Sequence, residues 1–391
     1  MSLHPDEQSP KRPSEPSQHG ETAAIAKPTL FNGATRHGLL GDLPMRHPWE
    51  LPLFVVAVAV TIGLNLLWLA SLVLLVVVAA RGESLVDVTD IDPIVIQLYA
   101  VIGVMPWAIW ILRALMYARM RAFAVRMTPT QFPEGYWMVA DAAQQMGMRR
   151  VPDAYVLIGN GVINAFAAGH GFRRYVAVHS DLFEVGGAVR DPEALRFVIA
   201  HEVGHHAAGH TGYFRLLLQN LAFQIPLLGK ALSRAQEYTA DNYGYSVVPE
   251  GAPGTMALLS AGKYLNAHVN VHELADRAAT EKGLWLHLVN WTSTHPITTW
   301  RAHALRDRTR SGKLWLRPKT TVYESLLPAG STFTSKHPTP QQALDLIDQA
   351  KERGWVLGEE QFGRFPGAHY PTPTMRPIHI RDPYSTGVAE D

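Results

Sequence analysis

Residues 191–210 read DPEALRFVIAHEVGHHAAGH. The opening Asp-Pro-Glu predicts a helix start, because it offers a capping side chain, a proline suited to the first turn and an acid at the positive end of the helix dipole. In a helix that continues from there, His201 and His205 lie on one face. The segment therefore predicts a helix that presents two imidazoles to one side.

Glu202 lies inside the same His-Glu-x-x-His pattern. Two imidazoles on one face can bind one metal ion, and Glu202 then lies beside its open coordination position. Zinc at such a site polarises a carbonyl group and lowers the pKa of a bound water toward about 7, while an adjacent carboxylate can pass the water's proton to a leaving amine. The pattern indicates metal-assisted hydrolysis, although a solvated helix rich in histidine would show the same residues.

A third metal ligand is predicted downstream, where residues 233–241 read SRAQEYTAD. As a helix, this segment places Glu237 and Asp241 on one face. One carboxylate can then bind the metal, and the other can accept a hydrogen bond from a ligand imidazole, which fixes the tautomer and orientation of the ring.

His210 is the alternative third ligand. A metzincin-type site needs glycine and histidine three and six residues after the second histidine of the pattern, but those positions hold Ala208 and Thr211. We therefore expect His210 to lie at the helix end or to support a ligand, and metal binding by this residue stays an alternative.

The amino-acid composition excludes several classes of functional site. Of 391 residues, 35 are Lys or Arg and 34 are Asp or Glu, and the formal net charge of +1 argues against a nucleic-acid binder driven by bulk charge. Cysteine is absent, which excludes disulfides, thiolate metal sites and a cysteine nucleophile. The strong metal ligands that remain are Asp, Glu and 18 histidines.

Two uncharged ranges predict a transmembrane hairpin over 49–127. The first, 51–80, would form a helix about 45 Å long, which exceeds the roughly 30 Å of a hydrocarbon core. The second, 93–112, is shorter and contains Gln97 and Pro106, so an interfacial or buried helix is the alternative for it. An amphipathic juxtamembrane helix is expected to follow.

The charges that flank these spans predict their orientation. The loop at 81–92 holds a single basic residue, whereas arginines precede the first span and follow the second. They are Arg36, Arg46, Arg113, Arg119, Arg121 and Arg126. By the positive-inside rule, both ends of the hairpin face the cytoplasm. The polar residues 1–48 are then expected to be a disordered cytoplasmic tail.

The range 128–312 is predicted to be a mainly helical α+β domain with a small β-sheet. Apolar residues have helical spacing over 134–146, and 154–158 reads as a strand. The ranges 162–167 and 175–179 flank a glycine-rich turn as the strands of a hairpin would.

Residues 313–391 are expected to be a C-terminal extension. An amphipathic helix is predicted at 339–351, and the proline-rich sequence from Gly363 onward is expected to be irregular.

Motifs occur in a recognisable order between Glu134 and about Leu305. They are Asn164-Ala165-Phe166-Ala167-Ala168-Gly169, the strand Val176-Ala177-Val178, the His-Glu-x-x-His pattern, the block from Ser233-Arg234 through Glu237 to Asp241, and Thr294-His295-Pro296 followed by Arg301. In this order they resemble the HtpX-like membrane zinc metallopeptidases, a gluzincin family that also contains the CAAX prenyl endopeptidases.

This resemblance implies one zinc ion per chain, bound by His201, His205 and Glu237. It also implies that Glu202 is the general base and that Asp241 is structural.

Further roles are implied for residues farther from the pattern. His295 and Arg301 would face the developing oxyanion or support the ligands. The range 162–167, with Asn164 and Ala165, is a candidate exposed strand edge, which can hold an extended peptide by main-chain hydrogen bonds. The resemblance implies that Asn164 lies near the scissile bond, and an ordinary sheet strand with a surface asparagine is the alternative.

The chain departs from the family between the second histidine and the third ligand. HtpX-like proteins usually carry two further membrane spans there, whereas this chain has only an apolar interval, 212–232, broken by Arg215, Asn220, Pro226 and Gly229. We expect the interval at most to lie along a membrane surface or to roof a cleft.

The favoured hypothesis is a membrane-anchored zinc endopeptidase that cleaves membrane or misfolded proteins on the cytoplasmic side. Its partners would be peptide or protein substrates and the lipid bilayer. The rival is a noncatalytic membrane scaffold or sensor that binds peptides or metal, against which the presence of Glu202 argues. A prenyl-peptide processing enzyme is a third interpretation, but that family encloses its active site among many membrane helices, and two spans cannot build such a chamber.

Overall fold

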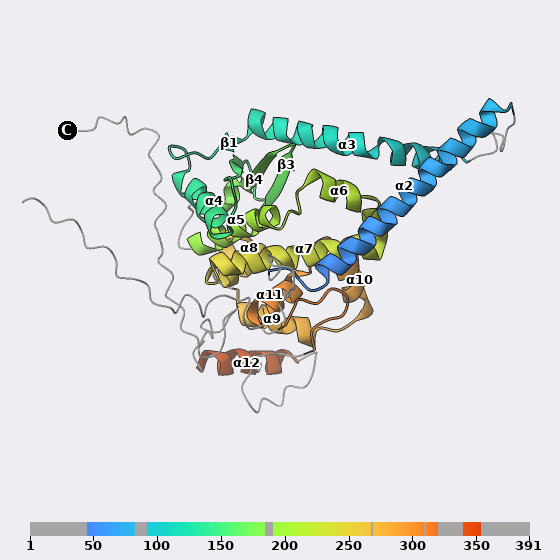
Figure 1. Ribbon diagram of the computed structural model, residues 1–391. Coiled ribbons are helices and arrows are strands. Elements are labelled where there is room, and N and C mark those ends of the chain that lie inside the picture. Colours follow the sequence, from blue (N-terminus) through green and yellow to red (C-terminus); the bar gives the residue numbers. More distant parts are fainter. Residues whose placement is uncertain are drawn as a thin grey trace, which may run out of the picture.

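The computed structural model describes residues 45–82, 92–183, 191–266, 269–308, 310–319 and 339–352. Most of the predicted tail at 1–48, most of the loop at 81–92 and the sequence from Gly363 lie outside the described residues. Two long N-terminal helices lead into a mainly helical domain with a small β-sheet (Figure 1). The predicted α+β class is confirmed.

The two long helices are α2 (Glu50–Ala80) and α3 (Pro93–Phe123). Both are long and apolar enough to cross a membrane, and α3 continues through the predicted juxtamembrane segment without a break. They cross near their linked ends, where the Trp68 ring lies against Gly103, and then diverge along two sides of the domain (Figure 1).

The β-sheet has four strands in the part of the chain described, in the order β1-β2-β4-β3. They are β1 (Val125–Arg126), β2 (Asp153–Leu157), β3 (Ala165–His170) and β4 (Arg173–His179). β2 and β4 run parallel, and the other two pairs are antiparallel. β3 and β4 form the predicted hairpin, and β3 lies at an edge.

The first strand of this hairpin begins at Ala165 rather than at the predicted Val162. The Val162 N–H donates to the Gly159 carbonyl at 2.9 Å, and the Gly161 N–H donates to the Asp181 carboxylate at 3.0 Å. Gly161 has a φ of 87°, a conformation that favours glycine. A turn anchored to Asp181 therefore occupies the start of the predicted strand.

Helices cover both faces of the sheet. The second half of α3 packs through Tyr117 on the face that carries Tyr155. The next residue, Val156, points to the opposite face and packs with α4 (Pro133–Gln145) and α5 (Pro192–Ala207). This alternation follows from the pleat of a strand. The sheet thus separates α3 from α5.

α5 begins as the sequence predicts and packs closely on α7 (Pro226–Val247). The Asp191 side chain accepts a hydrogen bond from the Ala194 N–H at 2.9 Å, which caps the helix. A Cβ on Gly204 of α5 would lie only 2.6 Å from the Cβ of Tyr243 on α7. Glycine at this position permits the close approach of the two helices.

The remaining helices complete the described chain. They are the short 3₁₀ helices η3 (Ser180–Leu182) and η5 (Leu221–Gln224), and α6 (Tyr213–Gln219), α8 (Gly251–Leu265), α9 (Val271–Thr280), α10 (Leu284–Thr292), α11 (Thr298–Arg306) and α12 (Pro340–Glu352). α12 corresponds to the amphipathic helix predicted at 339–351.

The apolar interval at 212–232 forms α6, η5 and the first turns of α7 instead of a membrane span. The Tyr213 hydroxyl of α6 donates to the Pro106 carbonyl of α3 at 3.1 Å, and Ala222 of η5 packs with Ala57 of α2. The interval therefore packs against both long helices. Because it forms no membrane span, α5 before it and α7 after it can lie on the same side of a membrane.

Residues just outside the predicted domain also pack on α7. His47 is buried, its N–H donates to the Thr239 hydroxyl at 2.9 Å, and its ring Nε2 lies 2.9 Å from the Gly312 carbonyl. Leu314 is buried in a cluster with Tyr238. The domain boundaries near 48 and 312 stay predictions, but the described residues on either side contact the same helix.

Candidate metal centre

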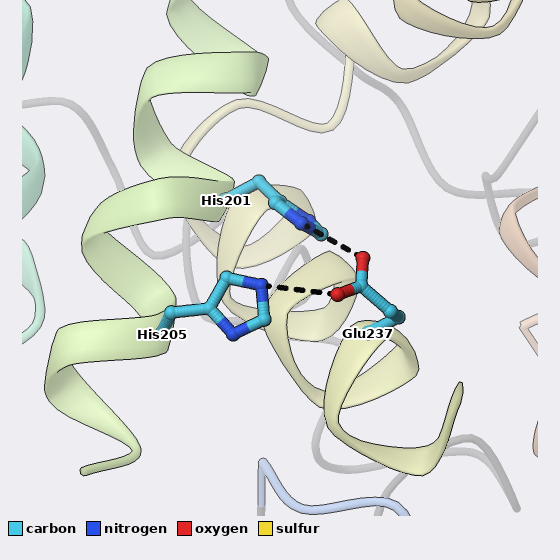
Figure 2. Close-up of side chains that lie close together, drawn as sticks. All are labelled: His201, His205 and Glu237. Carbon is cyan, nitrogen blue, oxygen red and sulfur yellow. Dashed lines mark ion pairs between the residues drawn. The ribbon is translucent and has the colours of Figure 1, made fainter. Parts of the chain in front are cut away.

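His201 and His205 on α5 and Glu237 on α7 point toward one another (Figure 2). The Nε2 atom of His201 lies 3.4 Å from Oε2 of Glu237, and Nε2 of His205 lies 3.5 Å from Oε1. One ligand atom from each residue lies within 4.8 Å of the others. The fold thus brings together the three residues predicted to bind the metal.

This geometry fits a zinc ion. Zinc binds histidine nitrogen and carboxylate oxygen at about 2.0–2.1 Å, so neighbouring ligand atoms of a tetrahedral ion lie about 3.4 Å apart. Each imidazole Nε2 atom lies close to this distance from one oxygen of the Glu237 carboxylate, His201 from Oε2 and His205 from Oε1. Two imidazoles and one carboxylate leave the fourth position open, as in catalytic zinc sites.

Asp241 and Arg301 hold the His201 ring. The Nδ1 atom of His201 lies 2.9 Å from Oδ1 of Asp241. Because a carboxylate only accepts, the ring donates from Nδ1 and turns its Nε2 toward Glu237. Arg301 on α11 donates to both oxygens of Asp241, at 2.5 and 2.8 Å. This is the placement expected of residues that support a ligand.

The electrostatics of the cluster suit a bound cation. Burial and Arg301 lower the pKa of the His201 imidazole, but hydrogen bonds with Asp241 and Glu237 raise it to about 9. Burial raises the pKa of Asp241, whereas Arg301 and His201 lower it to about 2. Two carboxylates that stay charged and draw a proton onto an imidazole would equally stabilise a divalent metal ion.

Glu202 is buried on α5 between the two histidines in sequence. Burial lowers the pKa of Arg301, but the nearby charges of Asp241, Glu237 and Glu202 raise it above its ordinary value. Glu202 therefore belongs to the same electrostatic environment as the predicted ligands, without being one of the three clustered residues.

His295 lies beside Glu237 and is exposed to solvent. Its Nε2 atom is 3.5 Å from Oε1 of Glu237, and its side chain is 65% exposed. Arg234 of α7 is buried and donates to the carbonyls of Asn290 at 2.7 Å and Ser293 at 2.9 Å, which holds the chain that leads to His295. The predicted Ser233-Arg234 motif thus contributes to the placement of His295.

Asn164 and Ala165 lie at the start of β3. The Asn164 carbonyl accepts a hydrogen bond from the His179 N–H of β4 at 3.0 Å. Among the described residues β3 pairs with β4 alone, so its other edge is unpaired there. β3 also packs against α5, the helix that carries His201.

His210 does not face Glu237 with the other histidines. Its Nδ1 atom lies 2.8 Å from Nδ1 of His205, and its Nε2 atom lies 3.1 Å from Oε1 of Glu50. Burial lowers the pKa of His210 to about 4, despite the opposite effect of Glu50. Glu50 is not predicted from the sequence as part of this centre, and the one signal it offers is a lone acid directly before a long apolar run.

The model of peptidase family M48 matches residues 131–223 and 212–309. The domain over 131–309 belongs to peptidase family M48. The first matched segment of this M48 peptidase contains the His-Glu-x-x-His pattern, and the second contains Glu237, Asp241 and His295. M48 members are metallopeptidases that typically use zinc, in keeping with the three clustered ligands. No curated protein and no solved structure matches the chain.

Proposed function

We propose that this M48 peptidase is a membrane-anchored, zinc-dependent endopeptidase that hydrolyses peptide bonds of membrane or misfolded proteins on the cytoplasmic side. The observation that carries the proposal is the cluster of His201, His205 and Glu237, in which His201 and Glu237 are buried and His205 is partly buried, with Glu202 on the same helix as the two histidines. Ligands of this type with an open position suit catalysis better than a purely structural metal site, which is usually closed by four protein ligands.

The residues of the metal centre have separate roles in peptide hydrolysis. His201, His205 and Glu237 hold the zinc ion, which when bound polarises the scissile carbonyl and lowers the pKa of water. Glu202 takes a proton from the attacking water and delivers it to the leaving amine. Asp241 keeps the proton of His201 on Nδ1 so that Nε2 is free to bind the metal.

His295 stabilises the charge that develops on the substrate. A peptide carbonyl oxygen gains negative charge as the water attacks, and a donor aimed at that oxygen lowers the barrier. His295 suits this role because it combines an exposed side chain with a position 3.5 Å from Glu237.

The substrate binds as an added strand on β3. An unpaired strand edge offers main-chain hydrogen bonds that hold a peptide extended, which suits cleavage of many sequences. The support for this step is the position of Asn164 and Ala165 at the edge strand and the packing of β3 on α5.

α2 and α3 anchor the enzyme in the bilayer. The support is their length, their apolar composition and the exposure of large apolar side chains along both, such as Leu67 at 69% and Trp107 at 69%. Side chains of this size that are exposed to water along a whole helix are unfavourable, whereas lipid accepts them. The arginines that flank the helices favour the cytoplasmic side for the catalytic domain.

The test compares wild type with Glu202→Gln, which keeps the size of the side chain but cannot accept the proton. We expect both purified proteins to fold and to hold about one zinc per chain. Wild type should cleave an unfolded protein such as casein, and either a chelator or Glu202→Gln should abolish nearly all cleavage. Zinc-loaded wild type that shows no metal-dependent cleavage would instead support the scaffold.

A further inference from the structure

Glu50, the first residue of α2, is a fully buried carboxylate surrounded by donors. Its Oε1 atom accepts hydrogen bonds from Arg46 at 2.5 Å and Arg215 at 2.6 Å, and Oε2 accepts from the Thr239 hydroxyl at 2.5 Å. The remaining partner of Oε1 is Nε2 of His210, at 3.1 Å. A buried charge is expensive unless it is paired, so these partners fix the position of the carboxylate firmly.

The directions of the hydrogen bonds follow from this carboxylate. Glu50 only accepts, so His210 donates from Nε2. Arg46 and Arg215 already supply two positive charges, so His210 is needed only as a neutral donor. A neutral ring that donates from Nε2 accepts at Nδ1, and His205 must then donate from its own Nδ1 across the 2.8 Å contact. His205 is left with an unprotonated Nε2, the atom that faces Glu237.

The two histidines of the metal centre are therefore held in equivalent ways. His201 donates from Nδ1 to Asp241, which Arg301 holds in place. His205 donates from Nδ1 to the ring of His210, and His210 in turn donates from Nε2 to Glu50. In both cases an arginine-bound carboxylate determines which nitrogen is free for the metal.

We propose that His210 and Glu50 are positioning residues of the metal centre, which act through His205 and make the start of α2 a part of the site. The inference rests on the proposed zinc-dependent function. Its consequence is that the first membrane helix does more than anchor the domain, because its first residue orients a zinc ligand.

The first experiment measures Zn²⁺ affinity of the purified full-length chain by competition with a chromophoric chelator. We expect His210→Leu, which cannot accept from His205, to bind Zn²⁺ about 10- to 100-fold more weakly than wild type. His210→Gln should recover most of this loss, because the amide oxygen can accept from His205 while the amide NH₂ donates to Glu50.

His206→Leu is the matched control. His206 is also buried at the end of α5, but its nitrogens contact the Thr211 hydroxyl at 2.8 Å and the Tyr175 carbonyl at 3.0 Å, away from the metal ligands. Its replacement should lower thermal stability and leave Zn²⁺ affinity unchanged. Equal losses of affinity in His206→Leu and His210→Leu would mean that His210 matters only for folding, which would overturn the proposal.

A double-mutant comparison tests whether Glu50 acts through His210. We expect Glu50→Gln alone to weaken Zn²⁺ binding and to weaken it no further when His210→Leu is already present, because the connection to His205 is then broken. The absorption spectrum of Co²⁺ bound in place of Zn²⁺ should change in His210→Leu and stay as in wild type in His206→Leu. Additive losses in the double variant would overturn the role of Glu50.

The outcome also separates this inference from the proposed function. If wild type binds no Zn²⁺, the proposed function fails and this inference fails with it. If wild type binds Zn²⁺ and His210→Leu binds it equally well, only the inference fails.

Discussion

The two ring nitrogens of each ligand histidine have different surroundings. In His201 and His205, Nε2 faces Glu237, while Nδ1 is taken by Asp241 in one ring and by His210 in the other. The hydrogen bond at Nδ1 fixes the tautomer and the plane of each ring, so that a metal ion bound at Nε2 would meet rings already oriented for it. The His-Glu-x-x-His spacing predicts that both rings lie on one face of the helix, but it does not predict which residues hydrogen-bond to Nδ1 of each ring.

Replacing Glu237 and Asp241 in turn should distinguish a residue that binds the metal from a residue that orients a metal-binding histidine. Glu237→Ala removes a metal ligand and should abolish stoichiometric zinc binding. Asp241→Asn keeps the shape of the side chain but weakens the hold on His201, so zinc affinity or activity should fall about 10- to 100-fold. Zinc titration of both purified variants checks this. Full zinc binding by Glu237→Ala would mean that the third ligand is another residue.

His295→Ala tests charge stabilisation in the transition state. If His295 donates to the developing oxyanion, its loss should lower kcat by roughly 10²- to 10³-fold while zinc content stays at the wild-type level. Steady-state kinetics on casein and metal analysis of the same sample provide the measurement. A variant that loses its metal or its fold would show that His295 is structural instead.

At the scale of elements, the contact between α5 and α7 creates the site. These helices supply His201, His205, Glu237 and Asp241, and their separation sets the distances between these side chains. The sequence predicts both helices from local signals, but nothing local says that they touch. Gly204 permits the contact because it has no Cβ to meet Tyr243.

Gly204→Ala should therefore push α5 and α7 apart. The added Cβ would lie 2.6 Å from the Cβ of Tyr243, and overpacking of this kind costs about 1–3 kcal/mol. We expect a lower unfolding temperature and weaker zinc binding. Gly212→Ala makes the same chemical change where the nearest atom would be 3.4 Å away and should alter neither property. Thermal unfolding and zinc titration that do not distinguish the two variants would contradict this account.

At the scale of the whole molecule, the absence of cysteine allows a direct test of topology. Single-cysteine variants carry one reactive thiol, so an impermeant thiol reagent added to intact cells reports which side that thiol faces. We expect Ser84→Cys, between the two helices, to be labelled, and Thr280→Cys, at the exposed end of α9, to be labelled only after lysis. Labelling of Thr280→Cys in intact cells would place the catalytic domain outside.

The sequence by itself determined the features that depend on neighbours along the chain. Hydropathy over 51–80 and 93–112 was enough to indicate two long apolar helices, because a helix of that length needs no partner to be recognised. The spacing of His201 and His205 was enough to place both on one face, because that face repeats with the helical turn. The hairpin and the capped start of α5 followed from local turn and capping residues.

Only the tertiary structure decided which of these faces meet. It packed α5 on α7, set α3 across the sheet from α5, and carried Glu50 from the start of α2 to His210, which lies far along the chain. Local periodicity reports which residues share a face, whereas the choice of partner faces comes from the packing of the whole chain. For that reason the three clustered residues could be predicted from motifs, while the buried Glu50 carboxylate that contacts His210 could not.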